Sequence, residues 1–409
     1  MSLRLPADPD AKMKSVLMVT DVPFWQRRKG NQQRIAEMLD YLADHFDMTV
    51  VFLGVELPEP RDDRLTVIHL CRHRGLSALA WKLFQSVPGR LQQALIRLLD
   101  RLHLQRSLES FDDEQVANRF SSTCNAGSFD AVIVEYIWHG YLARRVDRKR
   151  SLLLLDTHDI FHRRMAEYER FGRVPDKTVT REQELAVYEQ FDQLIAIQSA
   201  EFAYLESLFP GRVILAMHPA RACHRLYAER IRNRSLADKL VLVYFASYGD
   251  ANIDAIEWFM DEVWDPDLAG QFELQIHGAI CDSLRITAPG IRICGPSPTV
   301  VAVYRNADIA INPQRFGSGL KIKTVEAMGF GVPVLTTSCG AEGLEVAADR
   351  ALLCADDSAD MRQQLLRLAD PALRSSLSRS GLEFVADRLT PEACFGSLRR
   401  IINAHRPVN

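Results

Sequence analysis

Short apolar runs alternate along the chain with segments of helical spacing. The runs lie at 15–20, 47–54, 129–138, 151–159, 193–199, 212–220, 239–247, 272–278, 291–295, 308–312 and 333–337. Runs of this kind, bounded by polar and turn residues, are typical of buried strands. Regular alternation of strand and helix predicts an α/β fold with doubly wound parallel sheets, in which ligand loops follow the carboxyl ends of the strands.

A polar, basic stretch at 221–238 interrupts this alternation and is the best linker candidate. With 409 residues the chain is long for one core, so two domains are expected. We predict an N-terminal domain at 13–220, the linker at 221–238, a C-terminal domain at 239–388 and a final helix within 389–409. Thr390 followed by Pro391 gives that helix a cap and a favoured first residue.

The most informative stretch is 311–338, INPQRFGSGLKIKTVEAMGFGVPVLTTS. A strand at 308–312 runs into a glycine loop at 316–319, and a helix is predicted from about Lys321 to Phe330. The unpaired N–H groups of the first helical turn point into this loop. Strand, glycine loop and helix start together therefore suit an anion.

Two lysines, Lys321 and Lys323, fall in the predicted first turn of that helix. The helix dipole already places about half a positive charge there, so each cation is disfavoured by a few tenths of a kcal/mol, up to about 1. A bound phosphate or diphosphate would reverse that sign. The alternative is a pair of solvated lysines on an exposed helix end.

This segment resembles the donor-binding core of the retaining group 1 glycosyltransferases, and a subset of that family has the same Gly-Ser-Gly-Leu-Lys-x-Lys loop. The resemblance implies the GT-B fold, with two Rossmann-like domains facing a cleft and a last helix that returns to the N-terminal domain. It also implies a nucleoside-diphosphate sugar as donor. Glu326 matches the glutamate that holds the ribose, whereas Ser318 replaces the family's first glutamate. The donor site is expected to comprise Gly30, Asn31, Gly317, Ser318, Gly319, Leu320, Lys321, Lys323 and Glu326.

Gly30 and Asn31 enter this set because the loop after the first strand resembles the family's first glycine loop. A glycine that merely opens a helix is the competing interpretation. In the other half of the expected cleft, Asp156, His158 and Asp159 stand at the end of a buried strand. The resemblance assigns His158 to stabilising or positioning reactants near the anomeric carbon, and we place Asp156 and Asp159 on the acceptor side. Alternatively, His158 caps the helix that follows.

A metal site is the rival chemistry at the same place. His158 and His162 are one helical turn apart and Asp156 is adjacent, so these three could serve as ligands. We predict no metal, because no glutamate follows the first histidine as in H-E-x-x-H sites. We also expect no cofactor. Most family members have an Arg and a Lys after the strand at 239–247, but the loop 248–252 has no basic residue. Lys321 and Lys323 are therefore expected to neutralise the leaving diphosphate.

Composition limits the partners and the compartment. The net charge of −3 argues against a nucleic-acid partner, and no apolar run approaches the roughly 20 residues that span a bilayer. The eight cysteines stand singly, which indicates a reduced, cytoplasmic setting. The segment 72–107 holds seven basic residues and one acid. It predicts either a cover helix on a sheet or a basic surface that contacts anionic lipid on the inner face of the membrane.

We therefore expect glycosyl transfer with retention, from a nucleotide-sugar to a carbohydrate or lipid-linked glycan, in bacterial polysaccharide or glycolipid synthesis. A nucleotide-sugar epimerase of the same architecture and a catalytically silent binding module remain alternatives. A dinucleotide-dependent oxidoreductase is disfavoured, because no G-x-G-x-x-G lies between the first strand and its helix.

Overall fold

The computed structural model describes residues 13–27, 29–54, 62–70, 106–173, 175, 177–224, 239–285, 288–297 and 299–407. The polar N-terminal tail, the basic segment up to residue 105 and most of the predicted linker lie outside the described residues. The cover-helix and lipid-contact interpretations of the basic segment therefore stay predictions.

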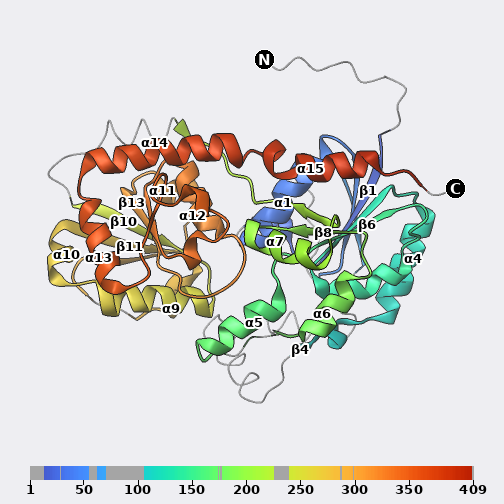
Figure 1. The fold of residues 1–409 in the computed structure, drawn as a ribbon, viewed down its shortest axis with the longest axis horizontal. Coiled ribbons are helices and arrows are strands. Elements are labelled where there is room, and N and C mark those ends of the chain that lie inside the picture. The colour runs from blue at the N-terminus through green and yellow to red at the C-terminus, as the bar shows by residue number, and fades with distance from the viewer. Residues whose placement is uncertain are drawn as a thin grey trace.

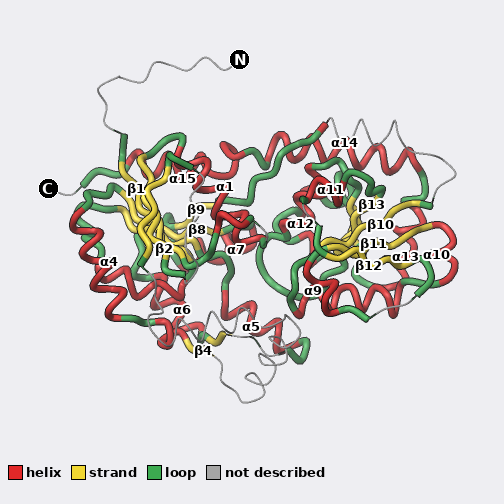
Figure 2. Tube along the Cα trace, turned by 180° about the vertical axis from the view of Figure 1, so that it is seen from behind, coloured by secondary structure: helices red, strands yellow, loops and turns green. Residues whose placement is uncertain are grey.

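Two separate parallel sheets organise the described chain (Figure 1 and Figure 2). The first has the order β3-β2-β1-β5-β6-β8-β9 and the second β12-β11-β10-β13-β14-β15. The first sheet contains β1 Ser15–Thr20, β2 Asp47–Phe52, β3 Leu65–His69, β5 Ala131–Glu135, β6 Leu152–Asp156, β8 Gln193–Ala196 and β9 Val213–Leu215. The second contains β10 Leu240–Phe245, β11 Phe272–His277, β12 Ile291–Gly295, β13 Ile309–Asn312, β14 Val334–Thr336 and β15 Leu353–Cys354. A short pair, β4 Arg106–Ser107 and β7 Lys177–Thr178, stands apart.

Helices cover the faces of both sheets (Figure 1). Those of the first half are α1 Gly30–Ala43, α4 Glu114–Ala126, α5 Phe161–Arg170, α6 Arg181–Tyr188 and α7 Ser199–Leu208. Those of the second half are α9 Asp250–Trp258, α10 Pro266–Gln271, α11 Val300–Tyr304, α12 Ile322–Gly329, α13 Ser358–Arg367, α14 Pro371–Arg388 and α15 Pro391–Ala404. Short 3-10 helices are η1 Phe24–Gln26, η2 Leu108–Phe111, η3 Ile137–Arg145, η5 Ala279–Ser283, η6 Cys339–Ala341 and η7 Glu345–Ala347, and η4 Phe259–Val263 is a π-helix.

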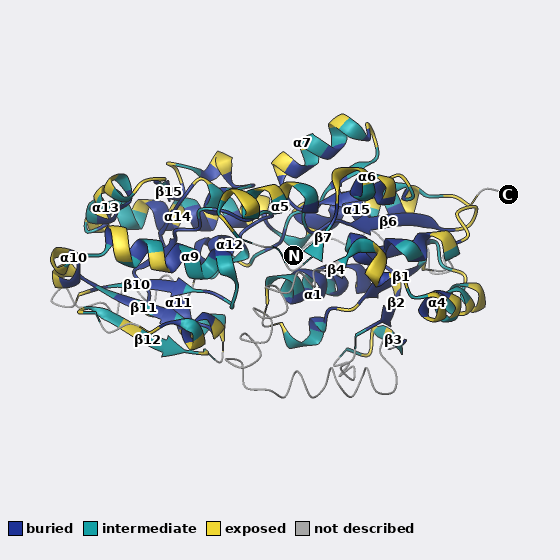
Figure 3. Cartoon of the chain, turned by 90° about the horizontal axis from the view of Figure 1, so that it is seen from below, coloured by how far each residue is buried: buried dark blue, intermediate teal, exposed yellow. Residues whose placement is uncertain are grey.

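Helices cover both faces of the sheets, and the strands β1, β2, β5, β6, β13 and β14 are apolar and buried along almost their whole length (Figure 3). The edge strands β3 and β12 are mostly half-buried. One helix boundary differs from the predictions. Lys321 precedes α12 as its N-cap instead of lying in its first turn.

The last helix returns to the first sheet, as the sequence predicts. α15 packs on α1, and Tyr41 of α1 donates a hydrogen bond to Glu392 at 2.5 Å. Lys14 donates to the carbonyl oxygens of Ile402 and His405 at 2.9 and 2.6 Å. These contacts join the two ends of the described chain. No helix in the described ranges has the length and apolar character needed to cross a bilayer.

Candidate active site

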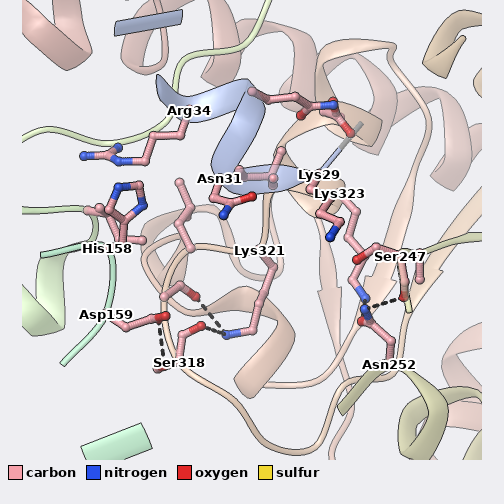
Figure 4. Close-up of a pocket in the computed structure, with 18 of the residues that line it drawn as sticks. Lys29, Asn31, Arg34, His158, Asp159, Ser247, Asn252, Ser318, Lys321 and Lys323 are labelled. Atoms are coloured by element: carbon pink, nitrogen blue, oxygen red, sulfur yellow. Dashed lines mark hydrogen bonds between the residues drawn. The ribbon is translucent and has the colours of Figure 1, made fainter. Parts of the chain in front are cut away.

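A cavity of about 260 Å³ lies between the two sheets and is lined by residues from both halves of the chain (Figure 4). It collects the loop after β1, the ends of β5, β6 and β10, and the start of α12. Of the residues predicted for the site, those that line it are Gly30, Asn31, His158, Asp159, Ser318, Gly319, Leu320, Lys321, Lys323 and Glu326. Gly317 and Asp156 do not line it.

The glycine loop before α12 is shaped by two residues with positive φ, Gly317 at 115° and Gly319 at 75°. Residues other than glycine rarely adopt this backbone conformation. Space is a second constraint, because a Cβ atom at Gly319 would lie 2.8 Å from a carboxylate oxygen of Asp159. The two glycines therefore let the loop turn while it approaches the N-terminal half of the chain.

Lys321 is buried and its ammonium group is fully engaged. It donates to the carbonyl oxygens of Gly319 at 2.8 Å and Ser318 at 3.2 Å, and to Glu342 at 2.9 Å. Burial opposes the charge, yet Cys339 and Glu342 together raise the pKa of Lys321. Lys321 thus holds the glycine loop in place, in addition to lining the cavity.

Lys323 is the more available cation. It donates to the side-chain oxygen of Asn252 at 2.7 Å and lies 4.9 Å from the ring centre of Tyr244. Burial, followed by repulsion from Lys321, lowers the pKa of Lys323 to about 7. The loop 248–252, which has no basic residue, therefore contributes a residue that orients a cation supplied by α12.

Glu326 faces the same cavity one helical turn further along α12. Burial raises the pKa of Glu326 to about 7, against the effect of a hydrogen bond with Gln33. A carboxylate in this position can accept hydrogen bonds from ligand hydroxyls.

His158 reaches the cavity from the end of β6, in the left-handed conformation at φ 57°. Its Nε2 lies 2.5 Å from Glu135, and its ring stacks on Tyr136 with centres 3.8 Å apart. The capping interpretation of His158 is wrong, because α5 has Ile160 as its N-cap residue. The sequence analysis missed Glu135, the last residue of β5, and Tyr136, which follows it, because they lie in an apolar run without a motif.

Asp156 lies below the cavity and not in it. It is fully buried and accepts two hydrogen bonds from Arg34, at 2.9 and 3.0 Å. Its placement on the acceptor side is therefore wrong, since a carboxylate paired in this way supports the cavity floor. Asp159, by contrast, lines the cavity and accepts a hydrogen bond from Ser318 at 2.7 Å, across the two halves of the chain.

The predicted alternative of a metal held by Asp156, His158 and His162 does not fit. Both ring nitrogens of His162 are engaged elsewhere, with Glu184 at 2.6 Å and Tyr204 at 3.0 Å. Among the described residues, the group with metal-ligand spacing is Glu135, Asp156 and His158. These side chains already neutralise one another and Arg34 through short contacts, so they do not form a cation site.

Comparisons with known proteins agree with this geometry. Residues 239–370 match the family described as "Glycosyl transferases group 1". Among solved structures, sucrose-phosphate synthase from Thermosynechococcus elongatus is 16% identical with a TM-score of 0.64, covering 96% of this chain and 100% of that one. HepE of Anabaena, in complex with UDP and glucose, is 12% identical with a TM-score of 0.62, covering 96% and 100%. WaaG, a glycosyltransferase involved in lipopolysaccharide biosynthesis, is 13% identical with a TM-score of 0.60, covering 95% and 100%. No curated protein sequence matches the chain.

The two sheets, the cavity between them and the returning last helix define a protein of the GT-B fold, as predicted. Residues 239–370, within its second half, match the group 1 glycosyltransferase family, which confirms the resemblance seen in that part of the sequence.

Proposed function

We propose that the protein transfers a sugar from a nucleoside-diphosphate sugar to an acceptor hydroxyl with retention of the anomeric configuration. The observation that carries this proposal is the cavity itself. A glycine loop, the first turn of α12 and the Lys323 ammonium face His158 and Asp159 across it. Helix-end amides and a cation suit a diphosphate, and Glu326 is available to a ribose.

The leaving nucleoside diphosphate gains negative charge as the glycosidic bond breaks, so its stabilisation is the main electrostatic task. In our proposal Lys323 and the α12 amides perform it without a divalent ion. HepE, a structural neighbour solved with UDP and glucose, supports a nucleotide-sugar donor. WaaG, described by its role in lipopolysaccharide biosynthesis, supports a bacterial surface glycan as acceptor class. The described cysteines are all free, in keeping with a cytoplasmic location.

A thermal-shift screen of UDP, GDP, dTDP and CDP, each with and without EDTA, tests the proposal. A ligand at 100 times its Kd that binds only the folded protein adds about 2.7 kcal/mol, which raises the Tm by several degrees. We expect one nucleotide to raise the Tm equally in both conditions. A shift abolished by EDTA would overturn the metal-free mechanism. No shift with any of the four would overturn the donor site and favour a silent module.

The matching nucleotide-sugar then decides the reaction. We expect NMR of the product to show the anomeric configuration of the donor. A donor that is converted to its epimer without an acceptor would assign the protein to the alternative epimerase chemistry.

A further inference from the structure

The ring of His158 has two different sides. Its Nε2 points at the buried end of β5 and β6, where Glu135 lies at 2.5 Å and Asp156 at 3.9 Å. The ring also lines the cavity, and none of the described residues forms a hydrogen bond with Nδ1. Nδ1 is therefore the nitrogen available to a ligand, and its proton decides whether His158 donates or accepts a hydrogen bond there.

The neighbours of Glu135 and His158 limit the net charge that these two side chains can carry together. Glu135 and Asp156 are both fully buried and sit opposite each other in the register of β5 and β6. Arg34 from α1 forms two hydrogen bonds with Asp156, so that cation is already balanced by one carboxylate. His218 adds no charge, because burial and Arg34 lower its pKa to about 3. A charged Glu135 would be a second buried carboxylate without a cation to balance it, which is costly.

Glu135 shows the consequence. Its Oε1 is buried without a hydrogen-bond partner in the described chain, and burial, followed by repulsion from Asp156, raises its pKa. The Glu135–His158 pair is neutral when it holds two protons. One proton lies in the hydrogen bond between Oε2 and Nε2. The other must then be on Nδ1, whichever side of the hydrogen bond holds the shared proton.

We propose that Glu135 and His158 share one proton and keep a second on Nδ1, so that His158 presents an N–H donor to a substrate oxygen in the cavity. Glu135 is thus a positioning residue that sets the protonation state of His158. Tyr136, whose ring is parallel to the imidazole within 8°, holds the plane of the donor. This inference rests on the proposed function, in which the oxygen belongs to the sugar or phosphate of the nucleotide-sugar. His158 then acts as a hydrogen-bond donor to that oxygen and not as a base.

Nitrogen NMR of the full chain labelled with ¹⁵N-histidine tests the protonation state directly. The signals of His158 are assigned by their loss in His158→Gln. We expect Nδ1 of the wild-type protein to be protonated at neutral pH. In Glu135→Gln the amide cannot take up the shared proton, and nearby Asp156 keeps the single ring proton on Nε2, so Nδ1 loses its proton. An unprotonated Nδ1 in the wild type would overturn the proposal.

Kinetics with the matching donor give the second readout. We expect Glu135→Gln to lower kcat by about 100- to 1000-fold, as when one catalytic hydrogen-bond donor is lost, while the donor KM stays within about threefold. His162→Gln is the matched control, because His162 also pairs with a buried glutamate, Glu184, but lies outside the cavity lining. An unchanged kcat in a folded Glu135→Gln protein would contradict the positioning role. Failure to bind any nucleoside diphosphate would instead sink the proposed function, and the NMR result would still decide the state of His158.

Discussion

Lys321 and Lys323 are two residues apart in the sequence, but their ammonium groups have different surroundings. Lys321 is bonded to loop carbonyl oxygens and to Glu342, which makes it part of the loop's structure. Lys323 contacts Asn252, a neutral group, and burial makes its charge costly. A bound anion would remove that cost.

We expect Lys323→Ala to weaken binding of the matching nucleoside diphosphate by about 1.5–3 kcal/mol, roughly 10- to 100-fold, the range of a charge-assisted hydrogen bond. The effect should depend on pH. Because the pKa of Lys323 in the empty site is about 7, binding above that pH requires proton uptake, and affinity should fall as pH rises from about 7 to 9.

Calorimetry at several pH values measures both effects. Lys323→Met keeps the apolar stem and removes the charge, so it separates electrostatics from packing. Titration of the ligand itself is common to all variants and cancels in the ratio of wild-type to variant affinity. A ratio that stays constant across this pH range would show that Lys323 does not meet the diphosphate as a cation.

At the scale of elements, the glycine loop 316–319 packs against α5 and the residue that follows it. Phe316 of the loop is buried between Phe171, with ring centres 4.6 Å apart, and Tyr168 at 5.1 Å. The backbone N–H of Gly317 donates to Glu167 at 3.0 Å. The glycine loop of the C-terminal half is thus held by a helix of the N-terminal half. These contacts can form only when the two halves of the chain are close together.

We expect Phe316→Ala to favour an open arrangement, since it removes aromatic contacts worth about 0.5–1.5 kcal/mol beyond simple burial. Nucleotide affinity should fall by roughly 2- to 12-fold, and small-angle X-ray scattering should give a larger radius of gyration. Phe330→Ala is the matched control, because Phe330 stacks on Tyr304 within the second half of the chain at 5.4 Å. Equal radii of gyration for both variants and the wild type would contradict the role of this packing.

At the scale of the whole molecule, the C-terminal helix is part of the N-terminal core. Phe395 of α15 is fully buried and lies 5.7 Å from the ring of Tyr41 in α1. Arg399 lies 2.7 Å from Nε2 of His45. The N-terminal core therefore includes residues from both ends of the chain, with the second sheet lying between them in the sequence. The domain limits predicted from the sequence stay a prediction.

We expect Phe395→Ala to lower the free energy of unfolding by about 3–5 kcal/mol, the usual cost of emptying a buried aromatic site. Urea denaturation followed by circular dichroism measures it. Arg400→Ala, on the exposed side of the same helix, should change it by no more than about 0.5 kcal/mol. Similar small losses in both variants would mean that α15 contributes little to the core.

The sequence by itself determined the strands other than β3, β4, β7 and β15, and the glycine loop before α12. It also placed His158 after a strand, and Lys323 and Glu326 on the helix that follows the loop. These features follow from local periodicity and turn residues, because buried parallel strands must be apolar and ligand loops must follow them. The returning helix was also foreseen, through resemblance to a family.

Only the tertiary structure decided which polar side chains meet. Glu135 pairs with His158 across 23 residues, Lys323 with Asn252 across 71 and Arg34 with Asp156 across 122. None of these pairs has a spacing that a sequence pattern could reveal. They are created by strand register and by the closure of two sheets on one cavity, where each buried charge must find a partner that the chain brings from a distance.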